Sequence, residues 1–261
     1  MIINNFMGGL GNQLFQIATG YAHAKKINSQ YAINYDLNHI GFGQGHHPQK
    51  YKETLYKKIP VTNRKITLVF EEKGFTYRPI VKMDNLCLVG YFQSDKYFKG
   101  YENQIKDLLE FDEKIREKVN NKMSKIEKKK VGVHVRLGDY LHKQYDGVFH
   151  IIDYPTYLER AMRLFDDNYE FLIFSDDPSL IKKKINLNNF IDLKNVNEVE
   201  DLFALSQCDS IIMSNSSFSW WGGWLGKSKE IIVSPDQWFG PKGPKDYDDR
   251  FSENWIKIQT N

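Results

Sequence analysis

Three side chains capable of acid–base chemistry or anion binding, His134, Arg136 and Asp139, stand at the end of an apolar run. The β-branched residues from 131 to 135 predict a strand buried in a sheet, and Gly138 predicts a sharp turn after it. Ligands of open α/β sheets bind outside the carboxyl ends of the strands, so a guanidinium there is a candidate clamp for a phosphate or carboxylate. An arginine paired with Asp139 for structural reasons alone is the alternative interpretation.

A second group of hydrogen-bond donors follows Ser214 and leads into an aromatic stretch that contains Trp220 and Trp221. Hydroxyl and amide side chains at a helix start cap its backbone N–H groups, and they also offer several donors to a phosphate. Capping needs one such residue, whereas several follow one another here. The surplus predicts an anion contact, and we interpret the tryptophans as structural. The residues concerned are Asn215, Ser216, Ser217, Phe218 and Ser219.

A glycine-rich turn lies near the N-terminus, between a strand predicted over 1–6 and a helix predicted over 14–26. Its glycines let backbone N–H groups approach a ligand at the positive end of the helix. The turn departs from the dinucleotide fingerprint because Leu14 stands where the third glycine belongs. It therefore indicates an anion or another ligand rather than NAD, with candidate contacts from Gly9, Gly11, Asn12 and Gln13.

Polar residues also follow two other predicted strands. Ser175 and Asp176 come after a strand over 169–174 and are candidates for contact with a nucleotide base or ribose, whereas Asp177 is equally well explained as a helix cap. The segment 90–94 follows a strand predicted over 86–91. Its polar and aromatic groups are a candidate platform for an acceptor sugar, with burial of the aromatic rings as the commoner use.

The remaining pattern distributes these residues over two α/β halves. A further strand is predicted over 31–36, and a helix over 101–130 ends in the basic run 125–130, which we interpret as a solvated helix end and a domain boundary. The alternation then continues with helices over 154–165 and 196–208, strands over 210–213 and 229–233, and a closing segment over 255–258.

Length and composition fit a two-domain globular protein. The chain has 261 residues, of which 41% are hydrophobic, and a formal net charge of +3. This length allows two domains of ordinary size, and so mild a charge predicts no nucleic-acid partner. Cys87 and Cys208 are predicted to be small buried residues in a reducing compartment. Because neither a signal segment nor a membrane span is apparent, we expect a cytoplasmic protein that at most rests on a membrane surface.

Two motifs resemble metal sites, and we predict that neither binds a metal. The neighbouring residues His46 and His47 have no third ligand at a recognisable spacing. The triplet Asp246-Tyr247-Asp248 follows a stretch rich in proline, glycine and lysine rather than a buried strand, so we expect a solvated loop. We therefore predict activity without a metal.

The motifs taken together resemble the α-1,2-fucosyltransferases of glycosyltransferase family 11. They occur in family order along most of the chain: Gly8 to Gln16, Gly90 to Gln93, Val133 to Tyr140, Phe174 to Asp177, Asp201 with Ser206 to Cys208, and Asn215 to Trp221. The resemblance implies a GT-B architecture, in which two Rossmann-like α/β domains face a cleft. It assigns 1–125 to an acceptor-side domain and 126–261 to a donor domain that binds a GDP-sugar.

The resemblance also implies the reaction. GDP-fucose would be the donor, no further cofactor would be needed, and L-fucose would pass with inversion to the 2-hydroxyl of a galactose-terminated oligosaccharide or lipid-linked glycan, as in polysaccharide biosynthesis. Arg136 would stabilise the departing diphosphate, helped by donors around Ser216, Ser217 and Phe218. His134 and Asp139 would support Arg136, and Asn12 would contact the phosphate or the fucose. The general base stays unassigned among Asp36, Asp95, His23 and Asp139.

Three alternatives remain open. The family has a second arginine where this chain has Leu137, which leaves another GDP-deoxyhexose possible as the donor. An NAD-dependent oxidoreductase would use the glycine turn and place Asp36 on the ribose, against the evidence of Leu14. A non-catalytic sugar-binding module would not need Arg136 together with two donor-rich helix starts.

Overall fold

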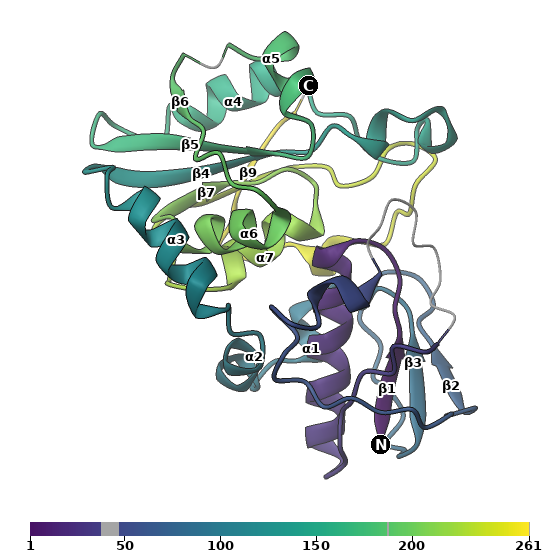
Figure 1. Ribbon diagram of the computed structural model, residues 1–261. Coiled ribbons are helices and arrows are strands. Elements are labelled where there is room, and N and C mark those ends of the chain that lie inside the picture. Colours follow the sequence, from purple (N-terminus) through teal and green to yellow (C-terminus); the bar gives the residue numbers. More distant parts are fainter. Residues whose placement is uncertain (38–46, 187, 261) are drawn as a thin grey trace. The chain divides into compact units, whose positions relative to one another are not determined.

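The computed structural model describes residues 1–37, 47–186 and 188–260, and it divides into two compact units (Figure 1). Unit 1 comprises Met1–Asp112 and Asp246–Phe251, and unit 2 comprises Glu113–Lys245 and Ser252–Asn261. The first boundary therefore lies at 112/113, whereas the sequence suggested 125/126. A short segment near the C-terminus also belongs to unit 1, which the sequence did not predict.

Unit 1 is built on a parallel three-stranded sheet in the order β1-β3-β2. The strands are β1 (Ile2–Asn5), β3 (Leu86–Val89) and β2 (Val69–Glu71), and the helix α1 (Leu10–Lys26) packs against β1. The predictions of β1, α1 and β3 are confirmed, and each of the three elements carries a run of buried residues. The predicted strand over 31–36 is wrong: Tyr31 and Ile33 form only single parallel bridges, to Ile2 and Val61.

Short helices complete unit 1. They are η2 (Pro48–Tyr51), η3 (Asp95–Tyr97), α2 (Glu102–Leu108) and η6 (Asp248–Arg250). The single helix expected over 101–130 is interrupted after α2, since Leu109 and Phe111 turn inward and are 1% and 7% exposed. The chain resumes as α3 (Glu113–Met123), which packs on α6 of unit 2 and thereby moves the boundary.

Unit 2 contains a parallel six-stranded sheet in the order β6-β5-β4-β7-β8-β9. Counted from β4 as the first strand of this unit, the order is 3-2-1-4-5-6, that of doubly wound nucleotide-binding sheets. The strand order reverses between β4 and β7, which makes this point the expected ligand site. The strands are β4 (Lys129–Val135), β5 (Tyr169–Ser175), β6 (Phe190–Ile191), β7 (Ser210–Ile212), β8 (Ile232–Pro235) and β9 (Ile256–Ile258).

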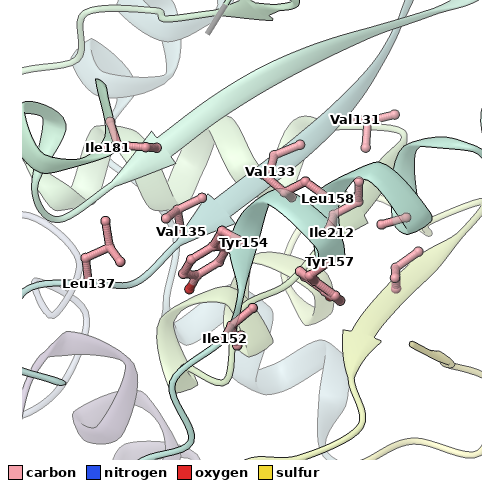
Figure 2. Close-up of a cluster of buried hydrophobic side chains, with 12 residues drawn as sticks. Val131, Val133, Val135, Leu137, Ile152, Tyr154, Tyr157, Leu158, Ile181 and Ile212 are labelled. Atoms are coloured by element: carbon pink, nitrogen blue, oxygen red, sulfur yellow. The ribbon is translucent and has the colours of Figure 1, made fainter. Parts of the chain in front are cut away.

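Helices cover both faces of this sheet (Figure 1). On one face α4 (Tyr154–Met162) packs over Val131, Val133 and Val135 of β4, and Figure 2 shows Tyr154, Leu158 and their neighbours closing this core. On the other face lie α6 (Glu198–Gln207) and α7 (Ser217–Trp224), which contact each other. The helix α5 (Pro178–Lys184) follows β5 and contributes Ile181 to the first core.

The expected buried residues are confirmed. Cys87 and Cys208 are free thiols, 5% and 0% exposed. Trp220 and Trp221 are almost fully buried and form an edge-to-face pair with a 5.3 Å centroid separation, as befits a structural role. Within the described ranges no helix is both long and apolar enough to cross a membrane.

Asp201 on α6 predicts a pH-dependent stability. Burial raises its pKa to about 6; the amide of Asn195 opposes this shift, and the nearby carboxylates of Asp192, Glu200 and Glu198 add to it. The folded state therefore holds a proton that the unfolded state releases near pH 4, so this group costs stability as the pH rises from about 4 to 6. We expect Asp201→Asn to raise the free energy of unfolding by about 1–3 kcal/mol at pH 8.

Urea unfolding of the wild type and Asp201→Asn at pH 8 and pH 4.5 measures this effect. Asn195 still has an oxygen to which it can donate in the variant, and the gain should shrink at the lower pH. Asp167→Asn, an exposed change in the same unit, is the matched control. An equal gain at both pH values would contradict the charge argument.

Candidate functional site

The site in unit 2 lies where three neighbouring strands end. Arg136 follows β4, Asp176 follows β5, and the segment 213–216 joins β7 to α7. Because β4 pairs in parallel with both β5 and β7, these residues share one edge of the sheet. They therefore gather at the point where the strand order reverses, as the sequence predicted for Arg136.

The guanidinium of Arg136 is held between two carboxylates. Its Nη2 lies 2.6 Å from Oδ1 of Asp139, and its Nη1 lies 3.1 Å from Oδ2 of Asp176. The group also lies over the ring of Tyr140, 5.4 Å from its centroid. Both interpretations of Arg136 thus find support: the pairing with Asp139 exists, and the side chain is still 25% exposed at the sheet edge.

Burial and neighbouring charge act in opposite directions on Arg136. Burial alone would lower its pKa, but Asp176, Tyr140 and Asp139 outweigh this effect, so the pKa is raised. The arginine is therefore a permanent cation at the site. A ligand phosphate that contacts Arg136 has to compete with the carboxylates of Asp139 and Asp176. These two aspartates therefore influence the affinity for the phosphate.

The backbone around Arg136 is fixed by buried groups. The hydroxyl of Tyr154 accepts from the Arg136 N–H at 2.8 Å and donates to its carbonyl at 3.0 Å. Oδ1 of Asp176 accepts from the Leu137 N–H at 3.0 Å, and a Cβ on Gly138 would overlap this carboxylate. The glycine thus permits the close approach of Asp176 to the turn.

Leu137 is a core residue. It is 3% exposed and belongs to the apolar cluster of unit 2, where Figure 2 shows it beyond the end of β4. Its side chain is buried in that cluster, whereas Arg136 keeps part of its surface open at the sheet edge. Leu137 therefore belongs to the core and has almost no surface at the sheet edge to offer a ligand.

The segment before α7 is partly structural. Ser216 caps the helix, accepting from the Phe218 N–H at 3.3 Å, and Ser217 and Phe218 are half-buried at its start. The amide of Asn215, by contrast, donates both hydrogens to the carbonyls of His150 and Trp238, each at 2.8 Å.

Asn215 and Ser219 were predicted to contact a ligand, but both form hydrogen bonds within the protein. Asn215 is 1% exposed, and Ser219 is fully buried with its hydroxyl 3.0 Å from the carbonyls of Ser214 and Ser216. A further hydrogen bond joins the segment after β4 to the segment before α7: the hydroxyl of Tyr140 donates to the Asn215 carbonyl at 2.8 Å. At the start of α7, Ser217 and Phe218 are half-buried, whereas Ser216 is 6% exposed and uses its hydroxyl in the cap.

His134 is a neutral support for the site. Its Nδ1 shares a 2.8 Å hydrogen bond with the Ser214 hydroxyl, and its ring packs 5.1 Å from that of Phe218. Burial first, and then the charge of Arg136, lower its pKa to about 3. A neutral imidazole held in this way is poorly suited to proton transfer near neutral pH, and its support of Arg136 stays a prediction.

Ser175 and Asp177 have local roles as well. Oγ of Ser175 accepts from the Asp177 N–H at 3.2 Å. Asp177 caps α5 by accepting from the N–H groups of Ser179 and Leu180, which confirms the capping interpretation. Ser175 and Asp176 both remain half-buried or exposed at the sheet edge, where a nucleotide contact is still a prediction.

The glycine turn of unit 1 is held by glutamines. Gly9 is the N-cap of α1, and its carbonyl accepts from the Gln13 N–H at 3.1 Å. Gln13 is fully buried, donates to the Gly8 carbonyl at 3.0 Å and accepts from the Tyr56 hydroxyl at 3.1 Å. Gln13 therefore shapes the turn, although it was predicted to contact the GDP-sugar. Asn12 is partly exposed and forms a hydrogen bond with Gln93.

The candidate general bases are scattered. Asp36 is exposed, and His23 lies buried on α1 with its pKa lowered, mainly by burial. Burial raises the pKa of Asp95 in η3 against the charges of Lys99 and Lys96. These three belong to unit 1, and Asp139 belongs to unit 2, so no base is assigned.

The metal-like motifs have other neighbours. His46 lies outside the described residues, and His47 caps η2 by accepting from the Gln49 N–H at 3.2 Å. Asp246 is exposed as expected, yet the loop is also tied to unit 1, because this carboxylate accepts from the Phe75 N–H at 3.2 Å. In the part of the chain that the structure describes, no three acidic, histidine or cysteine side chains group as metal ligands would. Metal independence remains a prediction.

Sequence reasoning missed several residues that shape the two sites. Tyr154 and Tyr140 were not singled out, because a tyrosine hydroxyl that holds backbone groups leaves no local signature. Arg250 was missed because it is distant in sequence from Gln93, whose Oε1 accepts from its Nε at 2.7 Å. The sequence signals for Gln93 were the clustering of polar residues at 90–94 and the motif Gly90 to Gln93.

Comparisons with known proteins agree with this picture. A family model described as glycosyl transferase family 11 matches residues 1–259. An α-1,2-colitosyltransferase from Escherichia coli is 28% identical, over 99% of this chain and 99% of that protein. A galactoside 2-α-L-fucosyltransferase from Caenorhabditis elegans is 27% identical, over 90% of this chain and 72% of that protein. The structure of the fucosyltransferase NodZ from Bradyrhizobium aligns with a TM-score of 0.54 at 13% identity, over 85% of this chain and 92% of that one. This likeness confirms the predicted fold class, α/β of GT-B type.

Proposed function

The chain belongs to glycosyltransferase family 11, and on that premise we propose that it transfers L-fucose from GDP-fucose to the 2-hydroxyl of a galactose-terminated glycan, with inversion. The observation that carries the proposal is Arg136, a permanent cation at the strand-order reversal of a doubly wound parallel sheet. A GDP-sugar would bind at this edge of unit 2. The acceptor, an oligosaccharide or a lipid-linked glycan, would be bound by unit 1.

The chemistry follows from where charge develops. As the acceptor hydroxyl attacks C1 of the sugar from the face opposite GDP, negative charge grows on the departing diphosphate. Arg136 would stabilise this charge, with further donors from Ser216, Ser217 and the backbone at the start of α7. Asp139 and Asp176 would keep the guanidinium oriented in the absence of ligand and would give up part of their contact to the phosphate.

A second donor is favoured by one specific observation. The Escherichia coli relative that aligns along 99% of this chain is named as a colitosyltransferase. Colitose is fucose without its 3-hydroxyl, so both sugars present the same anomeric centre and the same leaving group. A site that hydrogen-bonds the 3-hydroxyl would discriminate strongly against the deoxy sugar, whereas one that packs against this position would accept both.

Thermal unfolding with GDP, UDP and NAD tests the proposal. A nucleotide at 100 times its dissociation constant adds about 2.7 kcal/mol, which corresponds to a shift in Tm of roughly 5–10 °C for a chain of this size. We expect a shift with GDP alone, of equal size with EDTA or with magnesium. A shift with NAD and none with GDP would overturn the proposal in favour of an oxidoreductase, and a GDP shift that requires magnesium would contradict metal independence.

A further inference from the structure

We propose that Arg250 and Gln93 are positioning residues that fix the orientation of the Asn12 carboxamide. In this orientation the amide nitrogen of Asn12 donates a hydrogen bond to an oxygen of the bound substrate. This inference rests on the proposed function, since it assigns Asn12 to the substrate site. All three residues belong to unit 1, although they come from three separate stretches of the chain. Arg250 and Gln93 touch no substrate in this proposal and act through Asn12.

Arg250 lies in the segment Asp246–Phe251, which is held to the rest of unit 1 by several polar contacts. The Phe75 N–H donates to Asp246 at 3.2 Å, and the Tyr77 N–H donates to Asp249 at 2.7 Å. Lys96 forms an ion pair with Asp249. Arg250 itself is 2% exposed, and its guanidinium lies 4.2 Å from the centroid of the Phe75 ring. Such burial and anchoring give the arginine one position.

The chemistry of the guanidinium then determines two amide orientations. A guanidinium has only donors, so the group of Gln93 that faces Arg250 has to be its oxygen, and the two atoms lie 2.7 Å apart. The nitrogen of the same amide consequently faces Asn12 and donates to its Oδ1. Asn12 therefore turns its Nδ2, a donor, to the other side of its carboxamide.

The backbone on each side supports this relay, by which we mean the hydrogen bonds from Arg250 to Gln93 and from Gln93 to Asn12. Gln93 follows Phe92, whose φ is +50°, and a carboxylate oxygen of Glu72 accepts from the N–H groups of Tyr91 and Phe92 at 2.8 and 2.7 Å. On the other side, Gly8 has a φ of +69°, and a Cβ there would overlap Nδ2 of Asn12. The glycine turn thus leaves room for the nitrogen end of the amide.

The ligand of this donor is an oxygen that carries lone pairs or negative charge. Because the proposed function assigns the acceptor glycan to unit 1, a ring or glycosidic oxygen of that glycan, which can only accept, has this chemistry. An amide oriented the other way would place its carbonyl oxygen against an oxygen that carries no hydrogen, and the two lone-pair-bearing atoms would repel each other. The relay therefore makes a distant cation, Arg250, a determinant of how Asn12 binds.

Gln93→Glu tests the relay with an isosteric change. The introduced carboxylate can still accept from Arg250 through a charge-assisted bond, so the fold should be as stable as in the wild type. It cannot donate to Oδ1 of Asn12, so Asn12 should reverse and present its oxygen to the substrate. We expect kcat/KM for fucosyl transfer to fall at least tenfold, with an unchanged Tm. Gln49→Glu, an exposed change in the same unit, is the matched control and should retain activity.

A double-mutant cycle separates positioning from a general structural effect. If Gln93 acts through Asn12, then Gln93→Glu should have little further effect in an Asn12→Ala background. Full additivity of the two losses, or near-normal activity of Gln93→Glu beside an impaired Asn12→Ala, would overturn the relay. A wild-type protein that transfers neither fucose nor colitose would instead refute the proposed function, so the two failures are distinguishable.

Discussion

Arg136→Ala is expected to lower kcat/KM for sugar transfer by tenfold to a hundredfold or more. One charge-assisted hydrogen bond to the departing diphosphate contributes about 1.5–3 kcal/mol, and its loss acts where negative charge grows in the transition state. The substitution also leaves Asp139 and Asp176 facing the ligand without their shared cation. This repulsion should weaken GDP binding as well, so the shift in Tm caused by GDP should shrink.

Two further variants give this prediction its controls. Arg136→Lys keeps the charge but loses the fork that reaches both carboxylates, so we expect intermediate activity. Arg163→Ala removes an arginine of the same unit whose side chain is 74% exposed and pairs with Glu159, and it should have no effect on activity. Steady-state kinetics on folded variants, verified by circular dichroism, decide the matter. Near-normal turnover of Arg136→Ala would show that this arginine does not hold the leaving group.

Acid should unfold the protein partly through His134. Burial lowers its folded pKa to about 3, whereas the unfolded chain binds the proton near pH 6.5. A lowered folded pKa means that the full stability is present above about pH 6.5 and is lost as the pH falls towards 3. The loss amounts to about 1.4 kcal/mol per pH unit for one such group, or about 3 kcal/mol between pH 6.5 and 4.5.

His134→Asn isolates this contribution, because asparagine can bond to Ser214 and does not titrate. Urea unfolding at pH 7.5, 6 and 4.5 should show a shallower loss of stability in the variant than in the wild type. His23 and His150 also have lowered pKa values and contribute in the same direction in both proteins, so they cancel in the comparison. Parallel pH curves for the two proteins would contradict a buried neutral His134.

The strands and helices that follow clear patterns could be predicted from the sequence, and the others depend on tertiary context. β4 and β5 have buried β-branched or aromatic residues, and α1 has a sustained apolar stripe. β2 was missed because its three residues are exposed or half-buried and lie at the edge of the sheet, where they pair with β3. The segment 31–36 has a strand-like pattern, yet beyond single bridges the structure gives it no partner strand among the described residues.

The site was predictable at the level of residue types and strand ends. Arg136 could be placed because a strand followed by a glycine turn fixes its position at the sheet edge. The roles of Asn215 and Gln13 could not be predicted, because an amide that serves a ligand and one that serves backbone carbonyls look alike in sequence. Their partners, the carbonyls of His150, Trp238 and Gly8, become visible only in the structure.

Long-range polar contacts were the least predictable feature. Arg250 and Gln93 are separated by 157 residues, and no local pattern connects them. The triplet that begins at Asp246 suggested a metal site or a solvated loop, and neither interpretation revealed that it attaches the segment that carries Arg250 to unit 1. Sequence spacing therefore identifies a nearby pair such as Arg136 and Asp139 more readily than a relay of this kind.

The most direct test of the central claim is a transfer reaction in the presence of EDTA, with GDP-fucose as donor and a galactose-terminated oligosaccharide as acceptor, followed by NMR of the product. We predict an α-linked L-fucosyl group on the 2-hydroxyl of galactose and stoichiometric release of GDP. Transfer from GDP-colitose at a higher rate would change the donor and leave the mechanism intact. Absence of transfer from either GDP-sugar, by a protein that is stabilised by NAD or by no nucleotide, would contradict the account.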